Sequence, residues 1–445
     1  MILSQGKIFD SKEQNSVLES MEQQIQHTLQ KESLQTMTVV EAIDRLSREI
    51  AAGDFDVLFD TLPMGDSGEY KEQAIKLLSK ENILYKLKCE LGDDYEDGFR
   101  TQPPMGLADV GVRRMPLGVL LHITAGNADG LPAFSLVEGL LTGNINVLKL
   151  PQADNDVSLK MISRLIEIEP VLADYIYVFD TPSSDVTALK RMAELSNGIV
   201  VWGSDAAISA VRQMAPGGAK LIEWGPRLSF AYIAGYEGSS TESKEAGDMH
   251  GCDRRKEWTA LAEHIAKTKQ LLCSSCQVIY LDTKDISKLR DFGTEFLPYL
   301  ERAAKKYQSA SIGTRAQISL LKYTDTLEQI ITDQQQQNED ELKGEGCSIT
   351  ISSDSELELS YMFGNCLVKP LPRDQVMEEM RKHKDMLQTV GLICPNEQRA
   401  ELVNLLAGCG LNRITTAGNM SAYFSGEAHD GEFAMRRYMR IVNVE

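Results

Sequence analysis

The sequence predicts an α/β protein of two doubly wound lobes, preceded by a helical N-terminal region. Short β-rich runs alternate with helical stretches from residue 116 onwards, which is the pattern of a sheet covered by helices on both faces. A polar, glycine-containing stretch at 236–258 interrupts this alternation, and a second one starts at 277. Residues 12–98 instead hold few glycines and carry apolar residues at helical spacing, so helices are expected there.

The N-terminal helices are expected from the apolar periodicity of this first region. Val40, Ile43, Leu46 and Ile50 would share one face of a helix. Glycine and proline residues break the pattern near Gly53 and again at 63–68. We therefore expect several helices in this layer.

The two alternations set the order of elements in each lobe. The first lobe should hold strands with the sequences PLGVLLHI, INVLKL, YIYVFD and GIVVWG, and helices at 131–142, 156–170, 184–196 and 205–214. The second should hold strands at 277–281, 366–371 and 389–394, and helices at 257–269, 284–307 and 373–386. The Gln-rich stretch 333–346 is interpreted as a solvated loop, and the alternative is a disordered interaction tract.

Composition and charge narrow the function classes. The 445 residues include 46 Lys and Arg against 65 Asp and Glu, a net charge of −19, which argues against nucleic acid and anionic membranes as partners. Eight cysteines are sparse for this length, and the polar stretch after Met1 has no export signal, so a cytoplasmic protein with reduced thiols is expected. The most apolar stretch, 131–150, contains Glu138 and Asn144, so no membrane span is expected.

The segment LLCSSCQVIYL is the strongest candidate for chemistry. Cys273 follows a predicted helix and precedes a predicted strand, in a turn whose backbone N–H groups could bind an oxyanion, so it could act as a nucleophile. The alternative is a buried cysteine that packs as a small hydrophobic residue. A further alternative is a zinc site or a redox pair, because Cys273 and Cys276 have dithiol spacing and His250 and Cys252 could complete four ligands.

Four other segments carry candidate functional residues. Asn127 lies in a loop after a strand, where its amide could hold an oxyanion or could only shape the turn. Lys149 ends a strand, where it could meet a nucleotide or remain solvated. Gly203-Ser204 could form a phosphate-binding turn before a helix, although no complete G-x-G-x-x-G is present. Glu223 ends a short strand and could be a general base or a surface residue.

In this order and spacing, the five segments resemble the aldehyde dehydrogenase superfamily over residues 116–445. The C-terminal half is most similar to the acyl-CoA reductase family, of the bacterial bioluminescence fatty acid reductase type. The residues that carry this resemblance are Leu387-Gln388-Thr389-Val390-Gly391, Cys409-Gly410-Leu411-Asn412-Arg413-Ile414, Gly418-Asn419-Met420, His429-Asp430-Gly431 and Cys273-Ser274-Ser275. The resemblance implies an aldehyde-dehydrogenase-like fold.

The resemblance also implies catalytic roles. Cys273 matches the catalytic cysteine, Asn127 the oxyanion-hole amide and Glu223 the general-base carboxylate. Cys276 matches no functional position of the family. The insertion between Glu223 and Cys273 departs from the family pattern. A base that activates water would hydrolyse the thioacyl intermediate of a reductase, so Glu223 is expected either to deprotonate the thiol or to have a structural role.

Cofactor contacts are implied in the same way. Lys149 matches the lysine at the cofactor ribose, and Gly203-Ser204 match the pyrophosphate turn. Gln152 stands where NAD-dependent relatives have an acid three residues after the lysine, and its lack of charge favours NADPH as the cofactor. Phe363 lies in a cofactor-contacting motif, but Tyr361 replaces the glutamate that normally precedes it.

The expected function is NADPH-dependent reduction of an acyl-CoA, or of an acyl thioester delivered by an enzyme, to a fatty aldehyde through a thioacyl-cysteine. The alternatives are a non-acylating aldehyde dehydrogenase and a zinc-stabilised binding module. An acyl-protein synthetase and an acyl-transferase are possible partners by the resemblance, which also implies a homo-oligomer. The expected domains are a helical layer with the NADP(H)-binding domain at 1–255, a catalytic thiol domain at 256–412, and a tail at 413–445 that returns to the cofactor domain.

Overall fold

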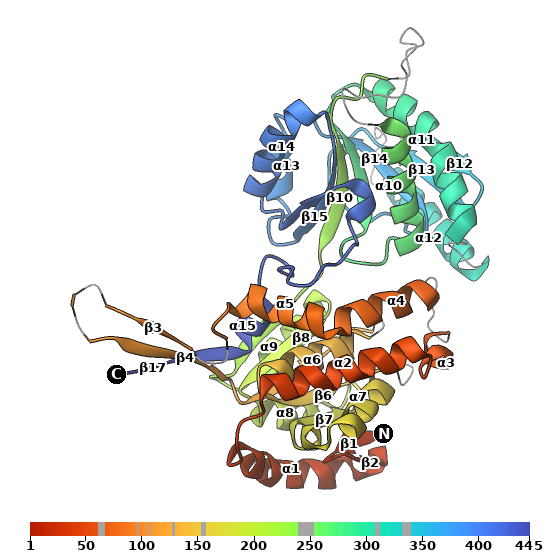
Figure 1. Cartoon of the computed structure of the whole chain (residues 1–445). Coiled ribbons are helices and arrows are strands. Elements are labelled where there is room, and N and C mark those ends of the chain that lie inside the picture. Colours follow the sequence, from red (N-terminus) through yellow and green to blue (C-terminus); the bar gives the residue numbers. More distant parts are fainter. Residues whose placement is uncertain are drawn as a thin grey trace. The chain divides into compact units, whose positions relative to one another are not determined.

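The chain folds into two compact units in the computed structural model (Figure 1). The structure describes residues 1–60, 67–95, 98–103, 105–106, 108–126, 130–152, 157–238, 253–307, 312–331 and 340–445. Unit 1 consists of Met1–Gly225 and Tyr423–Glu445, and unit 2 is Pro226–Ala422. The units therefore divide after residues 225 and 422, whereas the expected domains divide after 255 and 412. The first boundary lies earlier than expected because β10 (Leu228–Ile233) pairs within the sheet of unit 2.

Unit 1 is built on a seven-stranded sheet with the order β2-β1-β7-β6-β5-β8-β9. Its strands are β1 (Ile2–Ser4), β2 (Lys7–Phe9), β5 (Val119–Ile123), β6 (Ile145–Lys149), β7 (Ile176–Phe179), β8 (Gly198–Trp202) and β9 (Lys220–Trp224). All neighbours from β7 to β9 are parallel. Because β6 and β8 lie on opposite sides of β5, the sheet has a switch point between β5 and β8, where α/β folds bind ligands at the carboxyl ends of the strands.

Helices cover both faces of this sheet. The connections along the sheet are α6 (Leu131–Leu141), α7 (Val157–Ile168), α8 (Val186–Glu194) and α9 (Asp205–Met214). The N-terminal helices are η1 (Ser11–Glu13), α1 (Gln14–Leu29), α2 (Thr36–Ala52), α3 (Asp56–Phe59), α4 (Ser67–Leu78) and α5 (Lys80–Leu91). Helix α2 packs on α6 and α7, whereas α1 packs against α8 (Figure 1). The predicted helical N-terminal region is thus confirmed.

The sequence of α2 explains its place in this layer. Val40, Ile43, Leu46 and Ile50 are all buried in the core of unit 1. Gly53 ends the helix with a φ of 101°, a left-handed conformation that favours glycine. The apolar face and the glycine stop therefore fix both the orientation and the length of α2.

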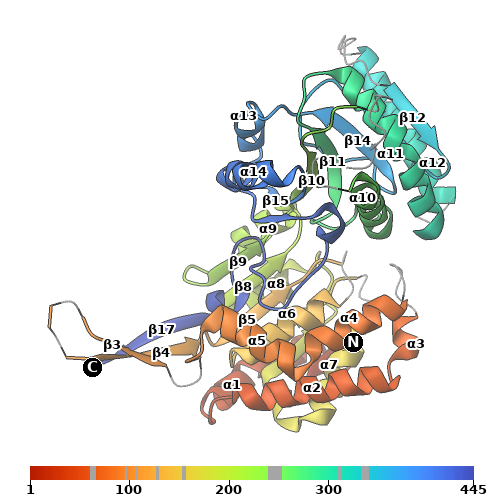
Figure 2. The same cartoon turned by 45° about the horizontal axis from the view of Figure 1, so that its top comes forward.

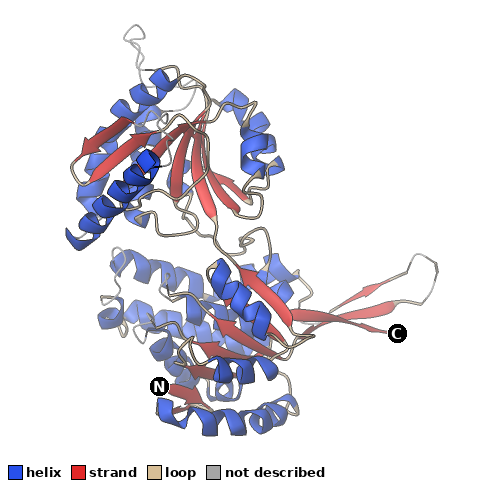
Figure 3. Cartoon of the chain, turned by 180° about the vertical axis from the view of Figure 1, so that it is seen from behind, coloured by secondary structure: helices blue, strands red, loops and turns tan. Residues whose placement is uncertain are grey.

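A three-stranded arm extends from unit 1 in all three views (Figures 1, 2 and 3). It consists of β3 (Phe99–Thr101), β4 (Val110–Pro116) and β17 (Met439–Val444), with β4 in the middle. A short helix, α15 (Ala434–Arg437), precedes β17. Phe99, Ile441 and Val444 of the arm are exposed although they are apolar. The arm therefore presents apolar side chains to its surroundings.

Unit 2 is built on a second seven-stranded sheet, with the order β12-β13-β14-β11-β10-β15-β16. Its remaining strands are β11 (Cys276–Leu281), β12 (Asp340–Gly344), β13 (Cys347–Ile351), β14 (Asn365–Pro370), β15 (Leu387–Ile393) and β16 (Arg413–Thr415). Among the described strands of this sheet, only β12 is antiparallel to its neighbour. Its helices are α10 (Arg254–Thr268), α11 (Ile286–Tyr307), α12 (Ile312–Ile331), α13 (Val376–Arg381), α14 (Asn396–Gly408) and η3 (Ala417–Asn419).

The helices of unit 2 lie on both faces of its sheet. Figures 1 and 2 show α10, α11 and α12 on one face and α13 and α14 on the other. Each face has its own apolar core, which includes Trp258 and Phe292 on the α10–α11 side and Tyr280 and Leu402 on the other. The prediction of a second doubly wound lobe is therefore confirmed.

Several elements have no counterpart in the sequence-based expectation. They include β1, β2, the strands of the arm, β10, α12, β13, α14 and β16. Of the Gln-rich stretch, 340–344 form β12, whereas the interpretation of 333–339 as a loop falls outside the described residues. No helix within the described residues is long and apolar enough to cross a membrane.

Candidate functional site

The thiol of Cys273 is exposed in the turn between α10 and β11. The amide of Gln388 on β15 donates a hydrogen bond to its Sγ at 3.4 Å. The hydroxyl of Ser229 on β10 donates to the backbone oxygen of Cys273 at 2.7 Å and accepts from the N–H of Thr389 at 3.1 Å. Two strands of the sheet thus hold the turn, and a neutral donor faces the sulfur.

Cys276 has the opposite environment. Its thiol is buried and donates to the backbone oxygen of Val278 at 3.4 Å, and burial raises its pKa to about 12. Its backbone N–H donates to Nε2 of His264 at 3.2 Å. Burial lowers the pKa of His264 to about 3, so the ring stays neutral and can accept this bond. The alternative of a buried cysteine that packs as a small hydrophobic residue therefore does not apply to Cys273, although it does describe Cys276. Cys273 has the exposure that a nucleophile needs.

The expected zinc ligands are only partly within the described residues. His250 and Cys252 fall outside them. Among the residues that are described, no group of three or more His, Cys, Asp or Glu side chains could hold a metal ion. Cys276 directs its thiol to a backbone oxygen.

Lys149 ends β6 at the carboxyl edge of the unit 1 sheet. Its Nζ donates to the hydroxyl of Ser183 at 3.1 Å, and burial lowers its pKa. Gln152, three residues later, is exposed. Lys149 is buried, and among the described residues it has no ion pair with a carboxylate.

The turn Gly203-Ser204 joins β8 to α9. Ser204 caps the helix, and its hydroxyl accepts from the N–H of Ala207 at 3.4 Å. A Cβ on residue 203 would lie 3.0 Å from the Cβ of Ala207, so glycine keeps the turn open. This turn follows the strand beside β5, at the switch point of the sheet.

Glu223 is held by an arginine at the end of β9. Nε and an Nη of Arg212 on α9 donate to its two carboxylate oxygens at 2.6 and 2.7 Å. These hydrogen bonds lower the pKa of Glu223. The ion pair therefore makes Glu223 a weak base.

Two predicted site residues remain. Phe363 lies in unit 2 with a φ of 49°, and its N–H donates to the backbone oxygen of Lys269 at 3.0 Å, next to the end of α10. The neighbouring Tyr361 ring lies under the ammonium group of Lys322 at 5.2 Å. Asn127 falls outside the described residues. Unit 1 thus carries Lys149, Gly203, Ser204 and Glu223 at one sheet edge, and unit 2 carries Cys273 and Phe363.

Sequence reasoning missed the polar residues that support these positions. Gln388 belongs to a motif that carries the family resemblance, but nothing in the sequence indicates that it contacts Cys273. Arg212 lies eleven residues before Glu223, and only the fold of α9 onto the sheet brings the two together.

Comparison with known families gives a match over nearly the whole chain. The sequence model described as acyl-CoA reductase (LuxC) matches residues 21–441. A long-chain acyl-protein thioester reductase 2 of Photobacterium leiognathi is 25% identical over 351 residues, which are 75% of this chain and 64% of that protein. A long-chain acyl-protein thioester reductase of Vibrio harveyi is 23% identical over 379 residues, 84% of this chain and 72% of that protein. The chain thus aligns with less than two thirds of the first relative.

Solved structures confirm the predicted aldehyde-dehydrogenase-like fold. The methylmalonate-semialdehyde dehydrogenase of Oceanimonas doudoroffii superposes with a TM-score of 0.73 at 12% identity, over 98% of this chain and 91% of that one. Lactaldehyde dehydrogenase from Escherichia coli gives a TM-score of 0.65 at 14% identity, with the same coverage of 98% and 91%. At such identities the likeness concerns the fold alone.

Proposed function

Because the chain belongs to the acyl-CoA reductase (LuxC) family, we propose that it reduces an acyl thioester to a fatty aldehyde, with NADPH as the electron donor. The observation that carries this proposal is the exposed Cys273 thiol with the amide of Gln388 at 3.4 Å. A hydrogen bond donated to sulfur stabilises the thiolate, which is the nucleophilic form. The acyl group comes from coenzyme A or from an acylated protein, since the named relatives are acyl-protein thioester reductases.

The reaction starts at the sulfur of Cys273. The thiolate attacks the carbonyl carbon of the thioester, the donor thiol leaves with a proton, and the acyl group stays on Cys273. NADPH, when bound, supplies the hydride that reduces this thioacyl group. The resulting thiohemiacetal releases the aldehyde and returns the thiol of Cys273. By the family resemblance, the side chain of Asn127 and the backbone N–H of Cys273 hold the oxyanion in both steps.

The state of Glu223 favours reduction over the alternative of aldehyde oxidation. An oxidising enzyme needs a base that activates water to hydrolyse the thioacyl group. Glu223 is instead paired with Arg212 through two hydrogen bonds that lower its pKa. We therefore assign Glu223 a structural role. Because it does not activate water, the thioacyl group is not hydrolysed before it is reduced.

The proposed reaction is tested with a panel of acyl-CoA thioesters and acylated carrier proteins. We expect NADPH oxidation, seen by absorbance, together with release of one free thiol for each aldehyde formed. Free thiol should also appear on mixing with the thioester before NADPH is added. Formation of a carboxylic acid from an aldehyde, without any thioester being consumed, would instead support the non-acylating dehydrogenase.

The NADPH preference is proposed from Lys149 and Gln152. Lys149 offers a positive charge at the end of β6, and the exposed Gln152 has no charge that would repel the 2′-phosphate of NADPH. The open turn at Gly203 lets a pyrophosphate approach the backbone, as the fold requires. These residue types fit a phosphorylated dinucleotide.

Substitution of Gln152 by glutamate is expected to shift the cofactor preference towards NADH by about tenfold in kcat/KM, or about 1.4 kcal/mol. A carboxylate would accept hydrogen bonds from both ribose hydroxyls of NADH and would repel a 2′-phosphate. The matched control Gln152→Met keeps the length of the side chain and adds no charge, so it should keep the preference for NADPH. A wild-type preference for NADH that Gln152→Glu leaves unchanged would contradict the assignment.

We also propose that the chain acts as a homo-oligomer and receives acyl groups from protein partners. Exposed apolar residues of the arm, such as Phe99 and Ile441, support contacts with another chain. By the family resemblance, an acyl-protein synthetase and an acyl-transferase are the partners proposed to supply these acyl groups.

A further inference from the structure

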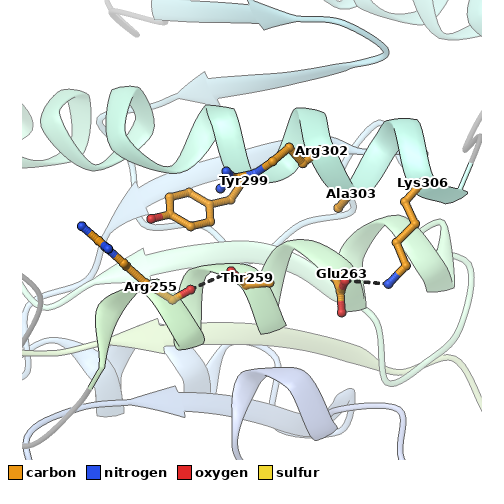
Figure 4. A pocket seen from close by; sticks show the side chains of 7 residues that line it. All are labelled: Arg255, Thr259, Glu263, Tyr299, Arg302, Ala303 and Lys306. Atoms are coloured by element: carbon orange, nitrogen blue, oxygen red, sulfur yellow. Dashed lines mark hydrogen bonds and ion pairs between the residues drawn. The ribbon is translucent and has the colours of Figure 1, made fainter.

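A groove of about 600 Å³ runs between α10 and α11 in unit 2 (Figure 4). Its volume is within the range of small-molecule sites. Its lining comes from both helices and consists of Arg255, Thr259 and Glu263 on α10, and Tyr299, Arg302, Ala303 and Lys306 on α11. We call it the α10–α11 groove. None of its residues takes part in the chemistry proposed for Cys273.

The α10–α11 groove has an excess of positive charge. Its one carboxylate, Glu263, pairs with Lys306 at 2.7 Å. Arg255 and Arg302 have no ion pair with any carboxylate among the described residues. The guanidinium of Arg302 lies over the ring of Tyr299 at 4.5 Å. Both guanidinium groups are exposed, so they can donate hydrogen bonds to an anionic ligand in the groove.

The groove is linked to the thiol turn through α10. Glu263 lines the groove, and its neighbour His264 accepts the N–H of Cys276, which begins β11 directly after the turn. Helix α10 ends at Thr268, about 7.5 Å beyond Glu263 at the usual rise of an α-helix. A ligand in the groove would thus contact the helix that leads into the turn of Cys273.

We propose that the α10–α11 groove binds the phosphate-bearing nucleotide end of the acyl donor, which is the chemistry of coenzyme A; this proposal rests on the proposed function. Guanidinium groups bind phosphate through paired hydrogen bonds, which Arg255 and Arg302 can both donate. The ring of Tyr299 between them provides an aromatic surface for a base. A concave site lined by few side chains favours a small nucleotide over the flat surface of a protein.

Binding of free coenzyme A to the full chain tests this proposal directly. In calorimetry, Arg255→Gln and Arg302→Gln should each weaken the affinity for coenzyme A about tenfold, because each removes a charge-assisted hydrogen bond. Lys305→Gln is the matched control, since Lys305 is exposed on the same helix, carries the same charge and does not line the groove. NADPH should not displace coenzyme A. Unchanged affinity in both arginine variants, or full displacement by NADPH, would overturn the proposal.

Turnover with two donors separates this site from the reaction itself. The arginine variants should raise KM for acyl-CoA with unchanged kcat, and should leave KM for an acyl-pantetheine, which lacks the nucleotide, as in the wild type. If neither donor is reduced but the arginine variants weaken coenzyme A binding as expected, the groove is confirmed as a coenzyme A site and the proposed function is wrong. If the variants impair only turnover of an acylated protein and leave coenzyme A binding intact, the groove is a protein-docking surface and our proposal is wrong.

Discussion

Replacement of Cys273 by alanine is expected to abolish both aldehyde formation and covalent labelling by an acyl donor. The thioacyl bond forms on this sulfur, and no other group on the turn can replace a thiolate as nucleophile. Loss of the nucleophile should lower kcat to the detection limit, while binding of NADPH persists. Mass spectrometry after incubation with a radiolabelled or heavy acyl thioester measures the label, and absorbance measures NADPH oxidation.

The control for this prediction is Cys276→Ala, at the start of β11 directly after the turn. Cys276 is buried with a raised pKa, so at neutral pH it stays a thiol and should not become acylated. The variant should therefore keep its label and most of its activity. Persistent labelling of Cys273→Ala, or loss of labelling in Cys276→Ala alone, would show that the nucleophile has been misassigned.

Replacement of Lys86 by methionine is expected to lower the free energy of unfolding of unit 1 by about 3–5 kcal/mol. Lys86 on α5 lies 2.5 Å from Glu90 and 3.0 Å from Glu138 of α6, and all three side chains are buried. Burial alone would lower the pKa of Lys86, but the two carboxylates raise it. Without the ammonium group, two carboxyl groups would remain buried with no opposing charge. Urea denaturation followed by circular dichroism measures the loss.

A second lysine on the same helix provides the control for Lys86. Lys88 pairs with Asp93 at 2.8 Å, and both side chains are largely exposed. Lys88→Met should change stability little, because exposed ion pairs contribute little. Equal effects of the two substitutions would contradict a structural role for the buried cluster.

The central strands of unit 1 could be predicted because their sequences are short, apolar and separated by helical stretches. All five residues of β6, Ile145–Lys149, are buried, as expected for a strand covered on both faces. Strand β1 could not be predicted in this way, because its three residues pair with β7, far along the chain. The same holds for the arm, in which β4 pairs with β17. Local patterns carry no information about such distant partners.

The candidate site shows the same limit. Cys273, Lys149 and the Gly203-Ser204 turn could be found because each follows or precedes a recognisable element. What each group can do depends on neighbours that only the fold provides. Gln388 reaches Cys273 because β10 lies between β15 and β11 in the sheet, and Ser229 of β10 donates a hydrogen bond to the backbone oxygen of Cys273. The ion pair of Glu223 likewise depends on the packing of α9.

The insertion of unit 2 within unit 1 has a consequence for the order in which the chain folds during synthesis. Unit 2 is one continuous segment, Pro226–Ala422, so all its strands are available before Tyr423–Glu445 are made. Unit 1 is discontinuous, and β4 must wait for β17 to leave the ribosome before the two can pair. Until then the apolar residues of β4 stay open to misassembly with other nascent chains. Ribosome stalling before Met439–Val444 have been made should therefore harm the arm of unit 1 while unit 2 is already folded.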